Sequence, residues 1–224
     1  MLTICTWLWG YKYNPSYVDK LAYGLRKHLK QPYRFLCMTN DRVRFTDGVE
    51  RHAIPDTNLL AYKGCFARLR MFDPDWQSNR GILGPIINLD LDVVITGELD
   101  VLFDRADTFV ILQGANSVNP CPYNGSVYMF QAGSHSDLWT DFSPKAVSTI
   151  PFYKFPDDQG WFHFKIPNAA GWQVGRESGI YAFEKPGWPA GVGLPLQAKI
   201  VAFPGGHDPS QCMHFDWVRE HWRT

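Results

Sequence analysis

The sequence predicts a single α/β domain with a mainly parallel central sheet flanked by helices. Strand-like apolar runs alternate with helix-like segments through residues 1–105, which is the pattern of a parallel sheet with crossover helices. The chain has 224 residues, of which 45% are hydrophobic, and this suffices for one packed core. From about residue 143 proline and glycine become dense, which predicts a loop-rich C-terminal part over the binding edge of the sheet.

The first elements follow from the spacing of apolar residues. Residues 2–9 are rich in threonine and large apolar side chains and predict a buried strand. A helix is expected over residues 14–30, because Asn14 is a good N-cap, Pro15 suits the first helical position and apolar residues recur at helical spacing. Two strands are expected to follow, at residues 33–41 and 49–55.

The middle of the chain alternates in the same way. Residues 61–74 place apolar side chains on one helical face, and Pro74 is expected to end that helix. An Asn124–Gly125 turn is expected to lead into a strand. After the helix, the expected elements are a strand from about residue 87 into the aspartates at 90 and 92, a helical turn at 97–103, and strands at 108–114 and 123–133.

Composition excludes several classes of protein. Lys+Arg and Asp+Glu both number 22, so the formal net charge is zero, which argues against a nucleic-acid partner. The five cysteines are scattered without a CxxC pair, so neither a zinc site nor a disulfide framework is indicated. The N-terminus lacks the features of a signal peptide, and no apolar run approaches the ~20 residues of a membrane span. We therefore expect a soluble cytoplasmic protein.

Two aspartates, Asp90 and Asp92, stand one residue apart at the end of an apolar run. Parallel sheets bind ligands at the carboxyl ends of their strands, so Thr6 and Asn40 are expected at the same edge. Carboxylates at i and i+2 can share one cation, and Mg²⁺ and Mn²⁺ prefer oxygen ligands, including those of substrate phosphates. The alternative is that the aspartates cap a helix or stabilise a turn. The pattern therefore favours a cation site for a diphosphate-bearing substrate.

Four sequence blocks, in this order, resemble glycosyltransferase family 8, which includes the glycogenin-like enzymes. They span roughly residues 60–165 and are FARLRMFDP, IINLDLDVVITGELDVLFD, YNGSVYMF and PDDQGWF. The resemblance implies a single GT-A (Rossmann-like) domain over residues 1–224, with a nucleotide-binding half at 1–105 and a sugar- and acceptor-binding half at 106–224. It also implies a nucleotide-sugar donor, most often a UDP-sugar, a Mn²⁺ or Mg²⁺ ion, and retention of anomeric configuration.

The resemblance further implies roles for individual residues. Asp90 and Asp92 would bind the metal, with Asp90 also near the donor. Arg68 would contact the donor's sugar or phosphates, where a rigid fork of permanently charged donors is suited. The sugar side would consist of Asn124, which shapes the pocket, Asp158, which bonds a hydroxyl, and Gln159, beneath the anomeric carbon. Structural alternatives stay open for three of them: an ion pair within its helix for Arg68, a turn for Asn124 and a helix cap for Asp158.

The chain departs from the family at the end of its first strand. The family usually has an aspartate there that contacts the base, and CTWLWGYKY contains none. The resemblance therefore leaves the identity of the base open. The expected substitutes are Thr6, Trp7 and Tyr11, with an aromatic ring stacked on the base, or Asn40 or Asp41.

A second departure lies near the C-terminus, in AKIVAFPGGHDP. The family's third metal ligand is a histidine where this chain has Ala202, and a phosphate-binding lysine is replaced by Asp208. His207 is the candidate replacement ligand, with a loop histidine free of metal as the alternative. Phosphate contact is then expected from Lys12, Lys199 or Arg176.

The segment 212–224 ends in a short helix with apolar residues at i, i+3 and i+7, namely Phe215, Val218 and Trp222. Packing against the domain is one explanation, and peripheral contact with a membrane is the other. Membrane contact would make a lipid-linked glycan the acceptor.

The sequence as a whole predicts a metal-dependent glycosyltransferase that moves a sugar from a nucleotide-sugar to a glycan, lipid-linked glycan or protein acceptor. Two alternatives remain. One is a non-catalytic nucleotide-sugar binding protein, which the altered C-terminal segment makes credible. The other is a haloacid-dehalogenase-type phosphatase, which also ends an apolar strand in DxD, although usually on its first strand.

Overall fold

The computed structural model describes residues 1–115, 121–150, 156–189, 191 and 193–224. Within these residues, a seven-stranded sheet has the order β3-β2-β1-β4-β7-β6-β8, and a three-stranded sheet has the order β5-β10-β9. The large sheet consists of β1 (Leu2–Trp7), β2 (Tyr33–Met38), β3 (Val49–His52), β4 (Pro85–Leu89), β6 (Phe109–Gln113), β7 (Tyr123–Gln131) and β8 (Ala170–Gln173). The small sheet consists of β5 (Val93–Ile95), β9 (Ile180–Ala182) and β10 (Ile200–Ala202).

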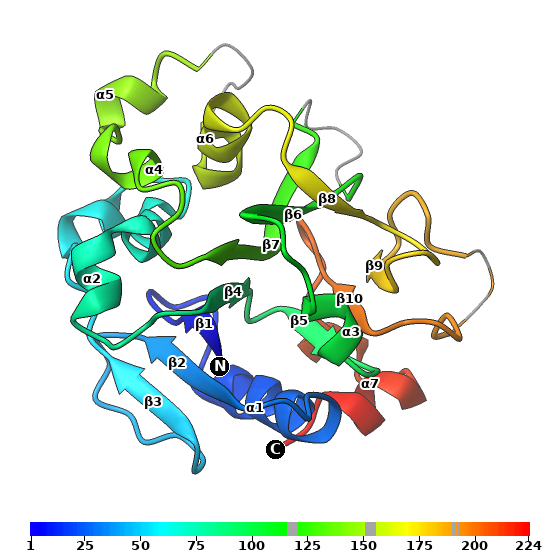
Figure 1. The fold of residues 1–224 in the computed structure, drawn as a ribbon. Helices are drawn as coiled ribbons and strands as arrows, with labels where there is room; N and C mark the ends of the chain where they lie inside the picture. Colours follow the sequence, from blue (N-terminus) through cyan, green and yellow to red (C-terminus); the bar gives the residue numbers. More distant parts are fainter. Residues whose placement is uncertain (116–120, 151–155, 190, 192) are drawn as a thin grey trace.

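Helices cover both faces of the large sheet (Figure 1). The helices α1 (Ser16–His28) and α7 (Asp216–His221) lie on one face, and α2 (Pro74–Ser78), α4 (Asp137–Thr140) and α6 (Asp158–Lys165) lie on the other. Alternate residues along each strand enter the two cores: Ile4 and Ile87 pack on the α1 side, and Cys5 and Ile86 pack on the α6 side. All six residues of β1 are buried because the strand is covered on both faces.

The expected parallel sheet is confirmed for the first four strands of the order. β1 pairs in parallel with β2 and β4, and β2 pairs in parallel with β3. β7 then runs antiparallel to both β4 and β6, so the sheet is mixed. The carboxyl ends of β1 and β4 therefore meet at one edge, and Asp90 follows β4 directly.

The chain leaves the large sheet at the paired aspartates and enters the small one. The amide of Asp90 still bonds the carbonyl of Ser126 at 2.9 Å, beside β7. The carbonyl of Asp92 instead accepts from the amide of Phe203 at 3.2 Å, and β5 then pairs antiparallel with β10. The segment between the strands is thus held from two sides at the junction of the sheets.

The prediction of a single helix over residues 61–74 is wrong. The structure has one 3-10 helix that ends where this range begins, η1 (Thr57–Ala61), and one inside it, η2 (Phe66–Phe72). Pro74 begins α2 instead of ending a helix, with Asp73 as its N-cap. Gly64 (φ 116°) and Cys65 (φ 60°) break the helix because both are left-handed. A Cβ on Gly64 would lie 2.8 Å from the Cα of Asp157, so a glycine is needed at this close approach.

The Asn-Gly turn expected before the strand at 123–133 is also wrong. Asn124 and Gly125 lie inside β7, where the pairing register shifts between Ile111 and Leu112 of β6. Ile111 pairs with Tyr128, whereas Leu112 pairs with Asn124, so β7 carries extra residues in a bulge. The bulge brings Asn124, Gly125 and Ser126 toward the end of β4.

The remaining elements are short, and those after residue 143 belong to the expected loop-rich C-terminal part. They are α3 (Asp100–Phe103), which confirms the expected helical turn, α5 (Pro144–Val147) and the 3-10 helix η3 (Pro209–Cys212). In α7, Val218 and Trp222 are buried in the core and Phe215 packs against it, so the packing explanation for this segment is supported. Among the described residues, no helix has the length and apolar character needed to cross a bilayer.

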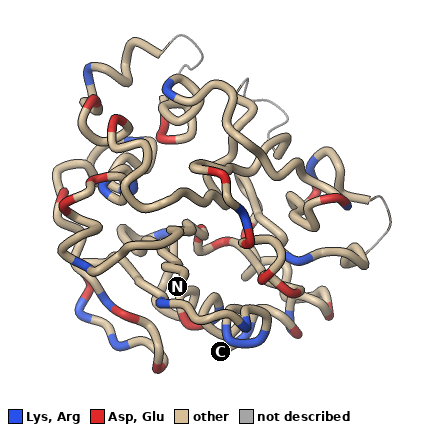
Figure 2. The backbone as a smooth tube through the Cα atoms, viewed as in Figure 1, with Lys and Arg blue, Asp and Glu red and all other residues tan. Residues whose placement is uncertain are grey.

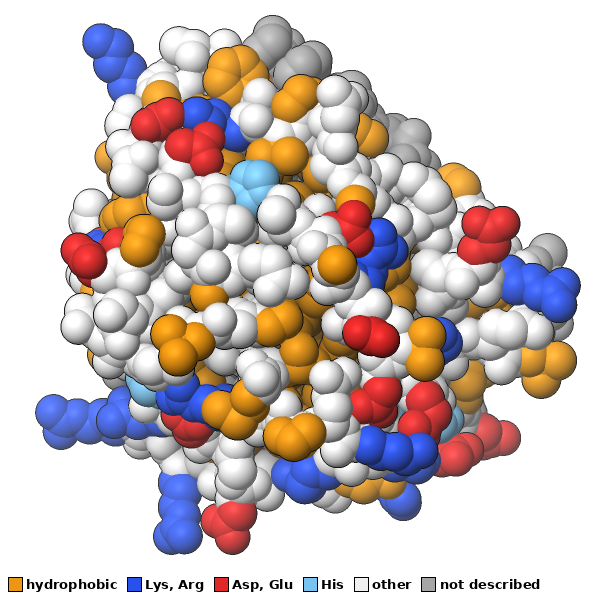
Figure 3. Space-filling model, in the orientation of Figure 1, with side chains coloured by type: hydrophobic (Ala, Val, Ile, Leu, Met, Phe, Trp, Pro, Cys, Tyr) orange, Lys and Arg blue, Asp and Glu red, His pale blue; other side chains and the backbone are white. Residues whose placement is uncertain are grey.

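Charge is mixed across the fold. Lysines and arginines alternate with aspartates and glutamates along the backbone (Figure 2). The face in Figure 3 likewise shows basic and acidic side chains next to one another, with hydrophobic groups between them. On this face, therefore, basic and acidic side chains do not form separate regions.

Candidate functional site

Two cavities adjoin at the carboxyl end of β4, with volumes of about 220 and 270 Å³. They share the side chains of Cys65, Arg68, Asp90 and Asp92. We call the first the aromatic cavity; its own lining residues are Trp7, Trp9, Lys12, Tyr13 and Leu91. We call the second the carboxylate cavity; its own lining residues are Gly64, Asn124, Gly125, Ser126, Asp157, Asp158, Gln159, Pro204 and Gly205.

Arg68, on η2, is the buried centre of the site. Its Nε and Nη2 donate to Asp158 Oδ2 at 2.7 and 2.6 Å, and its Nη1 donates to Asp90 Oδ1. Burial opposes the charge, yet the carboxylates of Asp158 and Asp90 raise the pKa of Arg68 well above its usual value. The structural alternative, an ion pair within its own helix, is therefore wrong: Arg68 joins η2 to the end of β4 and the start of α6.

Asp158 is the first residue of α6, and its neighbour Asp157 is the N-cap, accepting from the amide of Gly160 at 2.9 Å. The alternative that Asp158 caps the helix is thus wrong. Burial raises the pKa of the Asp158 carboxyl to about 7, and the Arg68 guanidinium opposes that rise. Asp158 therefore pairs with Arg68 at the wall of the carboxylate cavity.

Gln159 and Asn124 meet at the bulge of β7. The side-chain oxygen of Gln159 accepts from the amide of Gly125 at 3.0 Å, and Asn124 Oδ1 accepts from the amide of Ser126 at 3.0 Å. A Cβ on Gly125 would lie 2.9 Å from Arg68 Nη2, so this glycine admits the guanidinium. Asn124 therefore makes no turn before Gly125, contrary to its structural alternative; it bonds the backbone within β7 and lines the carboxylate cavity.

Asp92 is buried beside Asp90, and its carboxylate is contacted from the loop after β1. Its Oδ2 accepts from Lys12 Nζ at 3.3 Å and from the Tyr13 hydroxyl. Burial and then the like charge of Asp90 raise the pKa of Asp92 to about 6, and the Tyr13 and Lys12 contacts oppose the rise. The two carboxylates are therefore close enough to repel each other, and a cation between them would relieve that repulsion.

The oxygens of this pair suit a hard divalent ion. Asp90 Oδ2 and Asp92 Oδ1 accept no hydrogen bond within the described part of the chain, since the contacts of Arg68, Lys12 and Tyr13 all go to the other oxygens. Mg²⁺ and Mn²⁺ bind carboxylate oxygens and complete their shells with water or substrate phosphates. The two residues thus fit such an ion as a two-ligand protein site.

His207 does not join them. Its Nδ1 lies 3.8 Å from Glu184 Oε2, and its ring packs edge-on against Phe183. No group of three His, Cys, Asp or Glu residues among those the structure describes is arranged to hold a metal. Asp208, the next residue, accepts from the Tyr17 hydroxyl at 2.7 Å and caps η3.

The residues expected around the base divide into two groups. Trp7 lines the aromatic cavity, and Thr6 is fully buried beside it in β1. Tyr11 is fully exposed and Asn40 bonds the backbone of Ile54, and neither lines the two cavities. The structure therefore does not bring Tyr11 and Asn40 to these two cavities.

Sequence reasoning missed two aromatic residues of this loop, Trp9 and Tyr13. Trp9 packs edge-on against Trp7 with 6.4 Å between ring centroids, and both residues line the aromatic cavity with Lys12. The available signal was the density of aromatic residues directly after the first strand, in WLWGYKY. Of the three lysine and arginine candidates for a phosphate contact, Lys12 lies in this cavity, whereas Lys199 lines a different one.

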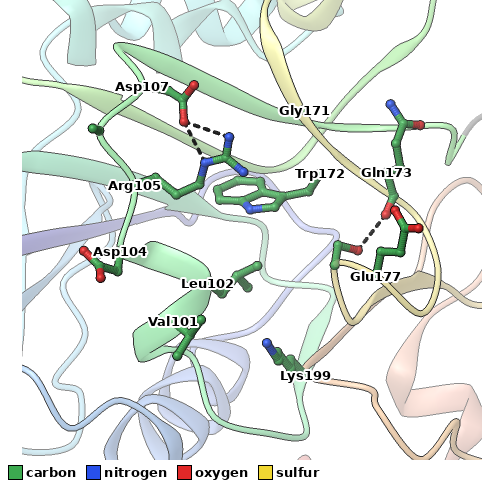
Figure 4. Close-up of a pocket in the computed structure, with 12 residues that line it drawn as sticks. Val101, Leu102, Asp104, Arg105, Asp107, Gly171, Trp172, Gln173, Glu177 and Lys199 are labelled. Carbon is green, nitrogen blue, oxygen red and sulfur yellow. Dashed lines mark hydrogen bonds and ion pairs between the residues drawn. The ribbon is translucent and has the colours of Figure 1, made fainter.

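That different cavity is larger, at about 520 Å³, and shares no lining residue with the other two. Arg105 and Asp107 pair with each other at 2.8 Å beside the ring of Trp172, and Lys199 lies across from them (Figure 4). Arg105 and Asp107 precede β6, at the opposite end of the sheet from Asp90. Because this pair is partly exposed and only two residues apart, it is typical of a surface ion pair.

Comparison with known proteins gives a fold but no sequence match. No protein-family model matches the chain, and no curated protein matches it by sequence. The structure of the galactosyltransferase LgtC in complex with donor and acceptor sugar analogues matches with a TM-score of 0.64 and 11% identity, over 98% of this chain and 93% of that chain. An active-site mutant of LgtC, in which a glutamine is replaced by glutamate, matches with a TM-score of 0.63 and 10% identity over the same shares.

The fold of this chain is therefore that of the GT-A glycosyltransferases, as the sequence blocks implied. Its structural neighbour LgtC is a galactosyltransferase, and at this low identity the likeness establishes the fold alone.

Proposed function

We propose that this protein is a glycosyltransferase that takes a sugar from a nucleotide-sugar, in the first instance a UDP-sugar, and transfers it to a glycan acceptor with retention. The observation that carries the proposal is the buried cluster of Arg68, Asp90 and Asp158 next to Asp92, at the ligand-binding edge of a GT-A sheet. The LgtC structure with donor and acceptor sugar analogues supports a nucleotide-sugar donor and a glycan acceptor.

Asp90 and Asp92 would hold Mn²⁺ or Mg²⁺. When bound, the ion supplies charge neutralisation for the departing diphosphate. Arg68 lines both cavities, as a contact with the donor requires, and its Nε, Nη1 and Nη2 also bind Asp90, Asp158 and the carbonyl of Gly125. Arg68 would also fix the Asp90 carboxylate in place, and Lys12, which pairs with Asp92 in this structure, would bind phosphate oxygens.

The aromatic cavity would bind the nucleoside. Trp9 is half-buried and edge-packed on Trp7, so its ring is held in a fixed orientation and one part of it faces the cavity. Stacking on such a ring tolerates any base, which leaves the choice of uracil to contacts around it.

Trp9→Ala is expected to weaken UDP binding by about 1–3 kcal/mol, or roughly 5- to 150-fold, because a base-stacking surface is lost. Trp9→Phe should retain most of the affinity. Calorimetric titration of UDP measures both, with Tyr11→Ala as the matched control, since Tyr11 is exposed outside the cavity. A larger loss for Tyr11→Ala than for Trp9→Ala would place the base elsewhere.

The carboxylate cavity would bind the sugar, with Asp158 and Gln159 on its wall. The side-chain oxygen of Gln159 lies at the bulge of β7, where it could face positive charge that develops on the sugar during transfer. The residue altered in the LgtC active-site mutant is also a glutamine, which supports this role.

Gln159→Ala is expected to bind UDP with Mn²⁺ within about twofold of the wild type and to lower turnover about 100-fold or more, as for other lost transition-state contacts. Release of UDP from the donor sugar, followed with and without acceptor, measures this. Gln173→Ala, in the cavity of Figure 4, serves as the control. Equal loss of binding and turnover would make Gln159 a structural residue.

The test of the proposed function is calorimetric titration of UDP, GDP and CDP, each with Mn²⁺ and with EDTA. Binding of one nucleotide that requires Mn²⁺ supports the donor site and identifies the base. Binding without turnover of any nucleotide-sugar would support the non-catalytic binding protein. Absence of nucleotide binding by folded protein would overturn the proposal and favour the phosphatase, in which the Asp90 carboxylate would be the nucleophile.

A further inference from the structure

Lys12 and Tyr13 both reach Asp92 from the loop that follows β1. Lys12 Nζ lies 3.3 Å from Asp92 Oδ2 and 4.5 Å from the centroid of the Tyr13 ring, and the Tyr13 hydroxyl donates to the same carboxylate oxygen. The two contacts differ in mobility. Tyr13 is a rigid ring that is mostly buried, whereas the Lys12 side chain is 60% exposed on a flexible four-carbon stem.

The need for a cation at this place comes from the two aspartates. Asp90 already pairs with Arg68, whereas Asp92 makes no contact with Arg68. Burial and the negative charge of Asp90 both oppose ionisation of the Asp92 carboxyl group. Among the described residues, Lys12 makes the ion pair to Asp92. The ammonium therefore supplies at Asp92 the positive charge that a divalent ion would supply.

We infer that Lys12 is an exchangeable counter-ion. In the ligand-free site it neutralises Asp92; when a divalent ion binds the free oxygens of Asp90 and Asp92, Lys12 leaves the carboxylate and binds the diphosphate of the nucleotide. The second half of this inference rests on the proposed function. Tyr13 keeps its hydrogen bond throughout and so holds Asp92 Oδ2 while Oδ1 stays available to the ion.

Electrostatic repulsion and attraction together explain why Lys12 would move from Asp92 to the diphosphate when the divalent ion binds. An ammonium beside a divalent ion on one carboxylate is repelled, and diphosphate oxygens that arrive in the adjoining cavity offer it a partner of opposite charge. Lys12 lines the aromatic cavity, so a change of its side-chain rotamer is the only movement that the exchange requires. Lys12 thus competes with the ion for Asp92 and strengthens binding of the nucleotide.

This dual role gives Lys12→Met opposite effects on the two ligands. Without nucleotide, the variant should bind Mn²⁺ about fivefold tighter, because a partly exposed competing ion pair is removed. With saturating Mn²⁺, it should bind UDP about tenfold weaker, because a charge-assisted contact to phosphate is lost. A residue that only supported the local structure would shift both affinities in the same direction.

The experiment is calorimetric titration of Mn²⁺ alone, and of UDP in saturating Mn²⁺ or in EDTA, into the wild type, Lys12→Met, Lys12→Arg and Lys145→Met. Lys145 is an exposed lysine of α5 and controls for the change in net charge. Lys12→Arg should restore UDP binding in part. A near-ultraviolet dichroism spectrum like that of the wild type confirms that each variant is folded.

Three outcomes would overturn the inference. They are unchanged affinities in Lys12→Met, a change of both affinities in one direction, and UDP binding by the wild type that is equally tight in EDTA, which would make Lys12 a permanent replacement for the ion. The proposed function fails separately, if the wild type binds no nucleotide. The titration of Mn²⁺ alone still tests the exchange at Asp92 in that case.

Discussion

Replacing Asp92 with asparagine is expected to lower Mn²⁺-dependent UDP affinity at least about 100-fold while leaving the ligand-free protein more stable than the wild type at pH 8. The first effect follows because Asp92 contributes one of two carboxylates to the proposed ion site, and even changes around metal ligands cost about 10–100-fold. The second follows because Asp92 is buried beside a like charge, which raises its pKa to about 6.

The stability effect has a defined dependence on pH. An acid whose pKa is higher in the folded state than in the unfolded chain destabilises the fold above the folded pKa, and this cost disappears below the unfolded pKa. For Asp92 the cost is complete above about pH 6 and is lost as the pH falls toward its ordinary value of 3.8. The asparagine variant should therefore gain about 1–3 kcal/mol at pH 8 and little at pH 4.

Thermal unfolding at both pH values, with and without Mn²⁺, measures these effects together with the UDP titration. Mn²⁺ should raise the melting temperature of the wild type and not that of Asp92→Asn. Asp104→Asn is the matched control, because it removes the same charge from an exposed position in the cavity of Figure 4. Normal Mn²⁺-dependent UDP binding by the Asp92 variant would refute the ion site.

Local patterns in the sequence predicted the elements whose structure is decided locally. The helix expected at 14–30 is α1, and the strands expected at 33–41 and 49–55 contain β2 and β3, because apolar periodicity reports which face of an element is buried. The incorrect predictions concern segments whose structure depends on contacts between residues that are distant in sequence. Gly64 breaks the helix expected at 61–74 because it packs against Asp157, and nothing near residue 64 reveals that approach.

In the candidate site, too, the sequence predicted which residues take part but not the contacts between residues distant in sequence. Arg68, Asp90, Asp92, Asn124, Asp158 and Gln159 line the carboxylate cavity, as the sequence blocks implied. The order of those blocks could not show that Arg68 pairs with two carboxylates, because these partners lie 22 and 90 residues away. Tyr11 and Asn40 were expected near the base because they follow strand ends. A position in the sequence does not determine the direction in which a side chain points.

Arg68→Met is expected to lower the free energy of unfolding by about 3–5 kcal/mol at pH 8, the usual cost of leaving a buried charge without its partner. Asp158 is only 2% exposed and would lose both the Nε and the Nη2 contacts. Burial raises the pKa of Asp158 to about 7 even with Arg68 present, and loss of the guanidinium raises that pKa further, so protonation can remove the unpaired charge at lower pH. The loss should therefore be smaller at pH 5 than at pH 8.

A second change separates charge from packing. Asp158→Asn in the Arg68→Met background removes the unpaired carboxylate and should recover part of the stability, so the two changes are less than additive in a double-mutant cycle. Urea unfolding measures each variant, and Arg105→Met controls for loss of a partly exposed pair with Asp107, which should cost less than about 1 kcal/mol. If Arg68→Met cost no more than Arg105→Met, the buried cluster would not be what holds Asp90 at the end of β4. The ion site would then have to be rigid for another reason, namely the backbone bonds that fix Asp90 to Ser126 and Asp92 to Phe203.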